Sequence, residues 1–137
     1  MNSNGTTSNH QVFHIDSLNI SQNGLKFIAS EEDYYPKWID TNKTMNDHCY
    51  TIGFGHAVPN LGTEPTIYAN GIELKDAASL LVSDVNADIA IFKNQVRQSG
   101  FVQMTQYEFD CLVSIFYGII GFMVRRTFRK LLKFPKR

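Results

Sequence analysis

The sequence predicts an α+β fold in which a small antiparallel sheet is placed between helical segments. Two observations support this prediction. Apolar residues recur at helical spacing in three segments, near residues 22–32, 74–96 and 105–116. Between the first two segments, residues 37–40 and 49–54 form two short strand-like runs that are joined by a polar loop. A helix, a sheet and then further helices, in that order, are typical of an α+β domain with segregated elements.

The composition is that of a single globular domain. The chain has 137 residues, of which 43% are hydrophobic and 19% charged, which suffices for one core. Basic and acidic residues number 13 each, so the total charge gives no indication of a nucleic-acid partner. We also expect the chain to be a monomer. Cys49 and Cys111 lie in unlike contexts without a CxxC pattern. We therefore predict two buried, unbonded thiols, no metal site and no cofactor.

Residues 1–16 are predicted to be a polar leader or linker, because they are rich in Asn, Ser and Thr. They lack the apolar stretch of a secretory signal, so we expect synthesis in the cytoplasm without a signal peptide. Ser21 is then placed to cap a short helix that continues to Glu32. The apolar side of this helix would carry Leu25, Phe27 and Ile28. Pro36 prevents the helix from continuing.

The two predicted strands are "KWID", residues 37–40, and "CYTIGF", residues 49–54. The loop between them, "TNKTMNDH", is longer than a tight hairpin turn. After the second strand, residues 58–71 are punctuated by Pro and Gly. We therefore expect that segment to be irregular.

Two further helices are predicted in the second half of the chain. Between Leu74 and Val96 the apolar residues at helical spacing are Ala77, Ala78, Leu81, Val85, Ile89 and Phe92. "TQYE", which starts at Thr105, has the form of a capping box and opens a very apolar helix. The apolar run at residues 111–124 is shorter than the roughly 20 residues that cross a bilayer. We interpret it as a buried core helix, with an interfacial segment as the alternative.

The last thirteen residues contain seven of the thirteen basic residues: Arg125, Arg126, Arg129, Lys130, Lys133, Lys136 and Arg137. A solvated charge block is the simpler interpretation, and a weak attraction to an anionic membrane or wall surface is the sharper one. Apolar residues interleave with these charges, as they do in interfacial helices. They are Phe122, Phe128, Leu131, Leu132 and Phe134.

The stretch "TIGFGH", which begins at Thr51, has two glycines inside a predicted strand. Glycine weakens a strand and often marks a place where something approaches the backbone closely. Because side chains alternate along a strand, Thr51, Gly53 and Gly55 would share one face. We interpret that face as open, with one hydroxyl on it, and a bulge beside a turn as the alternative. Ile52 and Phe54 would point into a core.

Acidic residues lie shortly before this stretch. Glu31, Glu32 and Asp33 end the first helix, and Asp40 lies on the first strand. Glycoside hydrolysis requires two carboxyl groups in unlike environments, one that stays protonated as the acid and one that stays ionised. Taken alone, a solvated acidic helix end explains the cluster more simply.

Together, "GLKFIASEEDYYPKWID" and "CYTIGFGHAV" resemble the phage-type lysozymes, glycoside hydrolase family 24. That family combines a Glu at the end of the first helix, an Asp on the first strand and a Thr inside "TIGxGH". "ELKDAASLLVSDVNADI" is similar to the family's helix between its lobes, and "MTQYEFDCLVSIFYG" to its central buried helix. The resemblance covers about residues 17–118.

The resemblance implies a lysozyme-like domain over residues 17–137, with two lobes and a cleft between them. A helix and sheet lobe would occupy residues 17–70, and an incomplete helical lobe residues 71–137. The implied activity is that of a muramidase, which hydrolyses the β-1,4 bond between N-acetylmuramic acid and N-acetylglucosamine with inversion. The implied partner is therefore the glycan strand of peptidoglycan in the bacterial cell wall.

The resemblance also implies roles for six residues. Glu32 would be the general acid, and Asp40 and Thr51 would place the water. Gly53 and Gly55 would clear room for the glycan, and His56 would be a structural histidine near the acid. Counting along the helix selects Glu32 as the acid, whereas counting back from Asp40 selects Glu31. We prefer Glu32, which would share the buried side of the helix with Leu25 and Ile28.

Three departures from the family pattern are visible. Asp33 stands where the family usually has Gly, and the loop between Asp40 and Thr51 is longer than usual. The resemblance also fades after Tyr117, with Gly118 where the family favours Asn. An incomplete second lobe would leave apolar surface uncovered on the last predicted helix.

Other functions are compatible with the sequence. The chain could be an inactive remnant that binds glycan or serves as a structural module, and its basic tail could act on membranes. A free endolysin and a phage-particle lysozyme are both compatible with the sequence. His10, His14 and His48 belong to no visible constellation.

Overall fold

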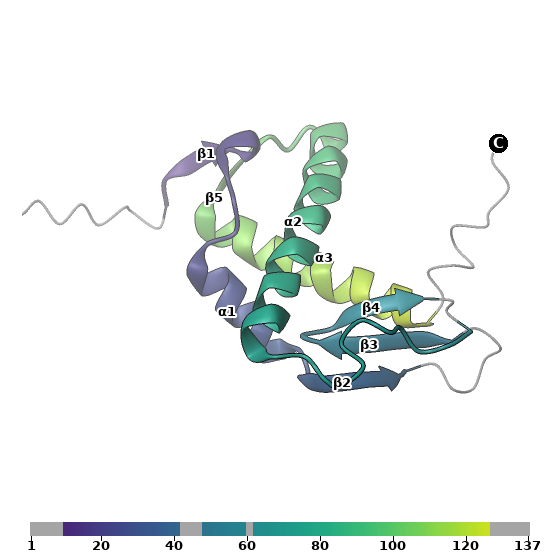
Figure 1. The fold of residues 1–137 in the computed structure, drawn as a ribbon. Helices are drawn as coiled ribbons and strands as arrows, with labels where there is room; N and C mark the ends of the chain where they lie inside the picture. Colours follow the sequence, from purple (N-terminus) through teal and green to yellow (C-terminus); the bar gives the residue numbers. More distant parts are fainter. Residues whose placement is uncertain (1–9, 42–47, 60–61, 127–137) are drawn as a thin grey trace, which may run out of the picture.

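The structure, a computed structural model, describes residues 10–41, 48–59 and 62–126. The elements in chain order are β1 (Val12–His14), the 3-10 helix η1 (Ile15–Ser17), α1 (Gln22–Glu31), β2 (Tyr35–Asp40), β3 (Cys49–Gly53), β4 (His56–Pro59), α2 (Leu74–Ser99), β5 (Gln103–Thr105) and α3 (Gln106–Arg126). The strands form two antiparallel sheets, β2-β3-β4 and β1-β5. These sheets lie at opposite ends of the molecule (Figure 1). The predicted α+β, lysozyme-like fold class is confirmed.

Helix α1 begins where the sequence predicts and is fastened to α3 at its first turn. The Ser21 hydroxyl accepts a hydrogen bond from the Gly24 N–H at 3.0 Å, as expected of an N-cap. The carboxylate of Asp110 on α3 accepts hydrogen bonds from both the N–H and the hydroxyl of Ser21. Ile28 is buried as predicted, but Phe27 is 53% exposed. The prediction for Phe27 is wrong because the packed face of α1 runs through Gly24 and Ile28.

The larger core belongs to the helical lobe. Its buried residues are Ile15, Leu18, Ile28, Leu81, Val85, Ile89, Phe92, Met104, Phe109, Val113 and Tyr117. Most of the apolar set predicted for α2 is therefore confirmed, although Ala78 is exposed. Ile28 of α1 packs in the same core as the residues of α2 and α3. Helix α1 thus lies with the helical lobe, whereas the division expected at residue 70 places it with the sheet.

The segment before α1 is part of the fold. Ile15 is fully buried, and β1 pairs with β5 in a register that places Val12 opposite Thr105. The prediction of a polar leader or linker up to residue 16 is therefore wrong for residues 12–16. Residues 1–9 lie outside the described part of the chain. The short β1-β5 pair closes the helical core at its far end (Figure 1).

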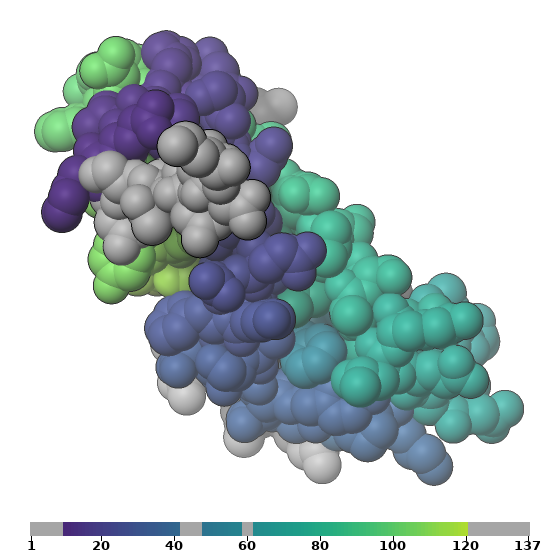
Figure 2. Space-filling model, turned by 90° about the vertical axis from the view of Figure 1, so that its left-hand side faces the viewer, coloured from purple at the N-terminus to yellow at the C-terminus, as the bar shows by residue number. Residues whose placement is uncertain are grey.

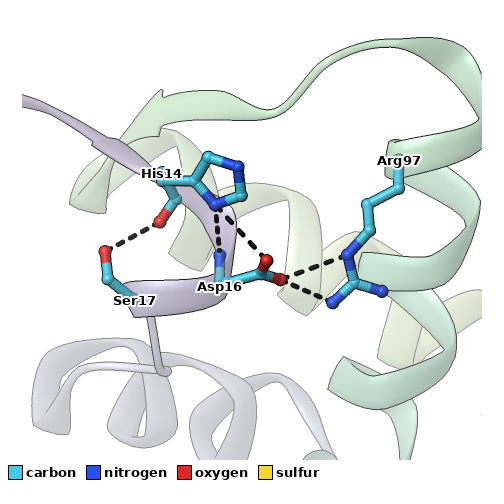
Figure 3. Close-up of polar contacts among 4 residues, drawn as sticks. All are labelled: His14, Asp16, Ser17 and Arg97. Carbon is cyan, nitrogen blue, oxygen red and sulfur yellow. Dashed lines mark hydrogen bonds and ion pairs between the residues drawn. The ribbon is translucent and has the colours of Figure 1, made fainter.

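An ion pair fixes this N-terminal segment to the last turn of α2 (Figure 3). The Arg97 guanidinium donates to Asp16 Oδ1 from Nε at 3.1 Å and from a terminal nitrogen at 2.5 Å. These hydrogen bonds hold the pKa of the Asp16 carboxyl below its ordinary value. The Asp16 N–H also donates to His14 Nδ1 at 3.2 Å.

Helix α3 begins with the predicted capping box. The Thr105 N–H donates to Glu108 Oε1 at 3.2 Å, and the Glu108 N–H donates to the Thr105 hydroxyl at 3.1 Å. Phe109, Val113 and Tyr117 form the buried side of the helix. Large apolar residues elsewhere on the helix are exposed: Leu112, Ile115 and Ile119. The segment 127–137, with most of the basic block, lies outside the described residues.

A smaller core lies between the sheet and the start of α2. It contains Trp38, Ile52, Ile72 and Ala77, and the Trp38 indole N–H donates to the Ile67 carbonyl at 2.7 Å. Strand β3 is central, with β2 on one side and β4 on the other. Strands β2 and β3 confirm the two predicted runs, whereas β4 is not predicted. Helix α2 contributes to both cores and joins the two lobes (Figure 1).

The molecule is elongated along the line that joins its two sheets. Figure 2 shows the N-terminal residues at one end of the outline and the residues of β2 with the start of α2 at the other. Within the described ranges, no helix combines the length and apolar character needed to cross a membrane. The same ranges hold no group of three or more His, Cys, Asp or Glu that is suited to a metal ion.

Cys49 and Cys111 form no disulfide, as predicted, but the prediction that both are buried is wrong for Cys111. Cys49 is buried in β3, whereas Cys111 is partly exposed on α3. Without a reductant, iodoacetamide is expected to label Cys111 in the native protein and both thiols in denaturant. Intact-mass analysis checks this, and a denatured monomer that takes up no label would contradict it.

Candidate active site

The two candidate acids lie at the end of α1. The helix ends at Glu31, and Glu32 is the C-cap residue, with an extended backbone and its N–H bonded to the Ile28 carbonyl at 3.2 Å. The expectation that Glu32 continues the buried face of the helix is therefore wrong, since helical periodicity stops one residue earlier. Glu32 is nevertheless half-buried, whereas Glu31 is exposed. Burial, rather than helical spacing, distinguishes the two residues.

A pocket of about 400 Å³ lies beside both glutamates, between α1 and α3. Its lining residues are Phe27, Ile28, Glu31, Glu32, Ser114, Ile115, Tyr117, Gly118 and Ile119. Apolar side chains form most of this wall, so a carboxyl group there has little water around it on one side. Such a setting favours the protonated form of a carboxyl group, which is what a general acid requires.

Asp40 is the last residue of β2, and its carboxylate lies beside a histidine. The distance from Asp40 Oδ2 to His48 Nδ1 is 2.5 Å, and the Cys49 N–H donates to Asp40 Oδ1 at 3.4 Å. The Asp40 side chain is 13% exposed and that of His48 is 40% exposed. The expectation that His48 belongs to no constellation is wrong. The available signal was hairpin geometry, since an antiparallel pair brings the residue after a loop back beside the residue before it.

Thr51 lies in the interior of the sheet. It is fully buried on the central strand β3, opposite Ile39 on β2 and Ala57 on β4. The interpretation of its face as open is therefore wrong. The Thr51 hydroxyl lies 3.3 Å from the hydroxyl of Thr41, which itself donates to the Cys49 carbonyl at 3.0 Å. Thr41, which directly follows Asp40 and which the sequence analysis missed, thus connects Thr51 to Cys49.

The two glycines of "TIGFGH" have different surroundings. Gly53 is buried with a φ of +64°, and an added Cβ would lie 3.3 Å from the Cβ of Ala77. It therefore makes room for α2, and the expectation that it clears space for a glycan is wrong. Gly55 has a φ of +83° and lies in the turn between β3 and β4. The turn that the sequence left as an alternative is thus present here.

His56 joins this turn to α2. Its Nδ1 lies 2.8 Å from Asp84 Oδ2, and both side chains are mostly buried. The Tyr117 hydroxyl on α3 donates to the Phe54 carbonyl of the same turn at 2.9 Å. Both contacts hold the β3–β4 turn against the helical lobe, which is compatible with a structural role for His56.

A second pocket, of about 160 Å³, lies beside Gly55 and His56 and is bordered by Asp84 and Asp88 of α2. Burial, together with the charge of Asp84, raises the pKa of Asp88 from 3.8 to about 6. Because the folded-state pKa lies above the ordinary value, ionised Asp88 destabilises the fold. This cost develops as the pH rises through the interval between those two values.

Asp88→Asn is therefore expected to raise the melting temperature at about pH 7.5 and to leave it nearly unchanged at about pH 3.5. The amide cannot ionise, so the substitution removes the penalty only where Asp88 is charged. Thermal unfolding of both proteins at the two pH values checks this. An equal shift at both values would show that the effect comes from packing instead.

The sequence is similar to known phage lysozymes. The phage lysozyme family model matches residues 38–133. An endolysin of Bacillus phage PZA is 33% identical over 102 residues, a match that covers 74% of this chain and 35% of the endolysin. The chain thus spans about a third of the length of that relative. No solved structure matches the chain significantly. Because the family match extends over most of the chain, from the end of β2 to beyond α3, the chain belongs to the phage lysozyme family.

Proposed function

We propose that the chain is a muramidase that cleaves the β-1,4 bond between N-acetylmuramic acid and N-acetylglucosamine in peptidoglycan. The observation that carries this proposal is the contrast between its two candidate carboxyl groups. Glu32 borders a largely apolar pocket, whereas Asp40 lies 2.5 Å from the His48 imidazole and accepts a hydrogen bond from the Cys49 N–H. Such unlike settings suit an acid that holds its proton and a carboxylate that stays ionised.

In the proposed reaction, Glu32 donates its proton to the oxygen that leaves the sugar. Asp40 orients a water molecule on the opposite face of the ring, and the water oxygen bonds to the anomeric carbon. The configuration at that carbon is therefore inverted. Thr51 serves as a positioning residue in this scheme, because its buried hydroxyl contacts Thr41 beside Asp40.

In the proposed reaction, the β3–β4 turn gives the sugar room to bind. Gly55 presents no side chain to the pocket beside it, so a sugar can approach the backbone there. His56 holds the turn through Asp84, and the buried Gly53 lets α2 pack beneath it. The proposed partner is the glycan strand of the bacterial cell wall, which either a free endolysin or a phage-particle enzyme would reach.

Clearing of purified, protein-free peptidoglycan tests the proposal. The wild-type chain is expected to lower the turbidity of the suspension and to release soluble glycan fragments. A chain that sediments with peptidoglycan and releases no fragments would be a glycan-binding remnant, and the muramidase proposal would be wrong. Leakage of anionic vesicles in a parallel experiment would indicate action of the basic tail on membranes.

A further inference from the structure

We infer that His48 is a catalytic residue of the proposed hydrolysis, with Asp40 as the carboxylate that orients its imidazole. His48 Nε2 accepts the proton of the attacking water. The inference rests on the proposed function and names the group that carries out its base step, so that Asp40 acts on the water through His48 and not directly. The long loop between β2 and β3, a departure from the family pattern, places this histidine directly before β3.

The first supporting observation is the contact between the imidazole and the carboxylate. His48 Nδ1 lies 2.5 Å from Asp40 Oδ2, a hydrogen-bond distance. An ionised carboxylate only accepts hydrogen bonds, so Nδ1 carries the hydrogen in this pair. In the neutral ring, Nε2 then has a free electron pair and acts as the base. A histidine held by a carboxylate through one nitrogen is a recurring general base in hydrolytic enzymes.

The second observation is the difference in exposure within the pair. The Asp40 side chain is 13% exposed, whereas that of His48 is 40% exposed. Water therefore reaches the imidazole more readily than the carboxylate behind it. Among the described residues, the titratable groups that face the His48 ring are Asp40 on β2 and the phenol of Tyr50 on β3. The Tyr50 ring is stacked on the imidazole, with the two ring centroids 6.1 Å apart. Neither carries a positive charge that would oppose protonation of the imidazole.

The water oxygen bonds to the anomeric carbon while one of its protons moves to His48 Nε2. The bond between that carbon and the leaving oxygen breaks, and Glu32 gives its proton to the leaving oxygen. After turnover, His48 loses one proton to solvent and Glu32 regains one. No oxidant, metal or further reactant is needed.

His14 provides a matched comparison within the same chain. It also lies beside a carboxylate, with Nδ1 3.5 Å from Asp16 Oδ2, at the opposite end of the molecule (Figures 1 and 3). Its Nδ1 accepts a hydrogen bond from the Asp16 N–H, so the neutral ring carries its hydrogen on Nε2. A His–Asp contact at that place therefore lacks the free Nε2 that the inference requires.

The test compares His48→Ala, His48→Gln and His14→Ala by the rate at which each releases reducing ends from purified peptidoglycan between about pH 4 and pH 8. General bases contribute roughly 100-fold or more, so both His48 variants are expected to lose at least about 100-fold in kcat/KM. His14→Ala should match the wild type. The acid limb of the wild-type rate profile should disappear in His48→Gln, because glutamine cannot take up a proton. Added imidazole should restore part of the rate of His48→Ala, which a purely structural role would not allow.

Melting temperatures of all variants check folding, and His48→Gln keeps an N–H donor for Asp40 should the alanine variant be unstable. Retained turnover in folded His48→Gln, or an acid limb that the His48 variants share with the wild type, would overturn the inference and leave the proposed function standing. A wild-type chain with no turnover would overturn both.

Discussion

Glu32→Gln is expected to lower peptidoglycan hydrolysis by at least about 100-fold, whereas Glu31→Gln leaves it within a few-fold of the wild type. Glutamine has nearly the shape of glutamate but holds no transferable proton. Glu32 is half-buried beside the largely apolar pocket, and Glu31 is exposed beside the same pocket. The more buried carboxyl group, that of Glu32, is the one proposed as the general acid.

The pair of substitutions controls for charge, because each removes one negative charge from the same end of α1. Rates of reducing-end release, with circular dichroism to verify folding, separate the two residues. If Glu31→Gln abolished turnover and Glu32→Gln retained it, the acid would be Glu31, the residue selected by counting back from Asp40. The difference in burial would then not identify the acid.

Gly24→Ala is expected to lower the free energy of unfolding by about 1–3 kcal/mol, the range for overpacking a closely packed site. An added Cβ would lie 2.6 Å from Ile20 Cδ1 and 2.8 Å from Asp110 Cγ. The Asp110 carboxylate cannot move freely, since it accepts hydrogen bonds from Ser21 and from the Gln106 side chain. The substitution therefore separates α1 from α3 at the place where the two helices are fastened.

Gly118→Ala is the matched control. It makes the same change within α3, where an added Cβ meets nothing within 4 Å. Replacing a helical glycine by alanine raises helix stability by up to about 1 kcal/mol, so the two variants should shift in opposite directions. Urea unfolding measures both. Equal shifts would mean that the close approach of α1 to α3 contributes little to stability.

Features that depend on neighbouring residues were predicted well from the sequence. The Ser21 cap and the Thr105–Glu108 capping box are local hydrogen-bonding patterns, and both are present. The buried stripe of α2 follows from the helical repeat and is also confirmed. The family resemblance, read from "TIGFGH" with its upstream acids, led to the fold class that the structure has.

Features that depend on distant residues were not predicted. The pairing of β1 with β5 joins residues about ninety positions apart, and neither strand is long enough to show a pattern. Burial of Thr51 follows from its pairing with β4, a strand that was not predicted and whose last two residues lie in the segment expected to be irregular. The role of Gly53 depends on Ala77, and that of His48 on Asp40. In each case the partner is set by tertiary packing, which local composition does not reveal.

The identity of the new reducing end tests the muramidase account most directly. Purified peptidoglycan is digested with the wild-type chain, reduced with borohydride and hydrolysed to its component sugars. Cleavage between N-acetylmuramic acid and N-acetylglucosamine leaves muramic acid at the reducing end, so muramitol is the expected product, and it should be absent with Glu32→Gln. Glucosaminitol in its place, or no reduced sugar above the untreated control, would contradict the account.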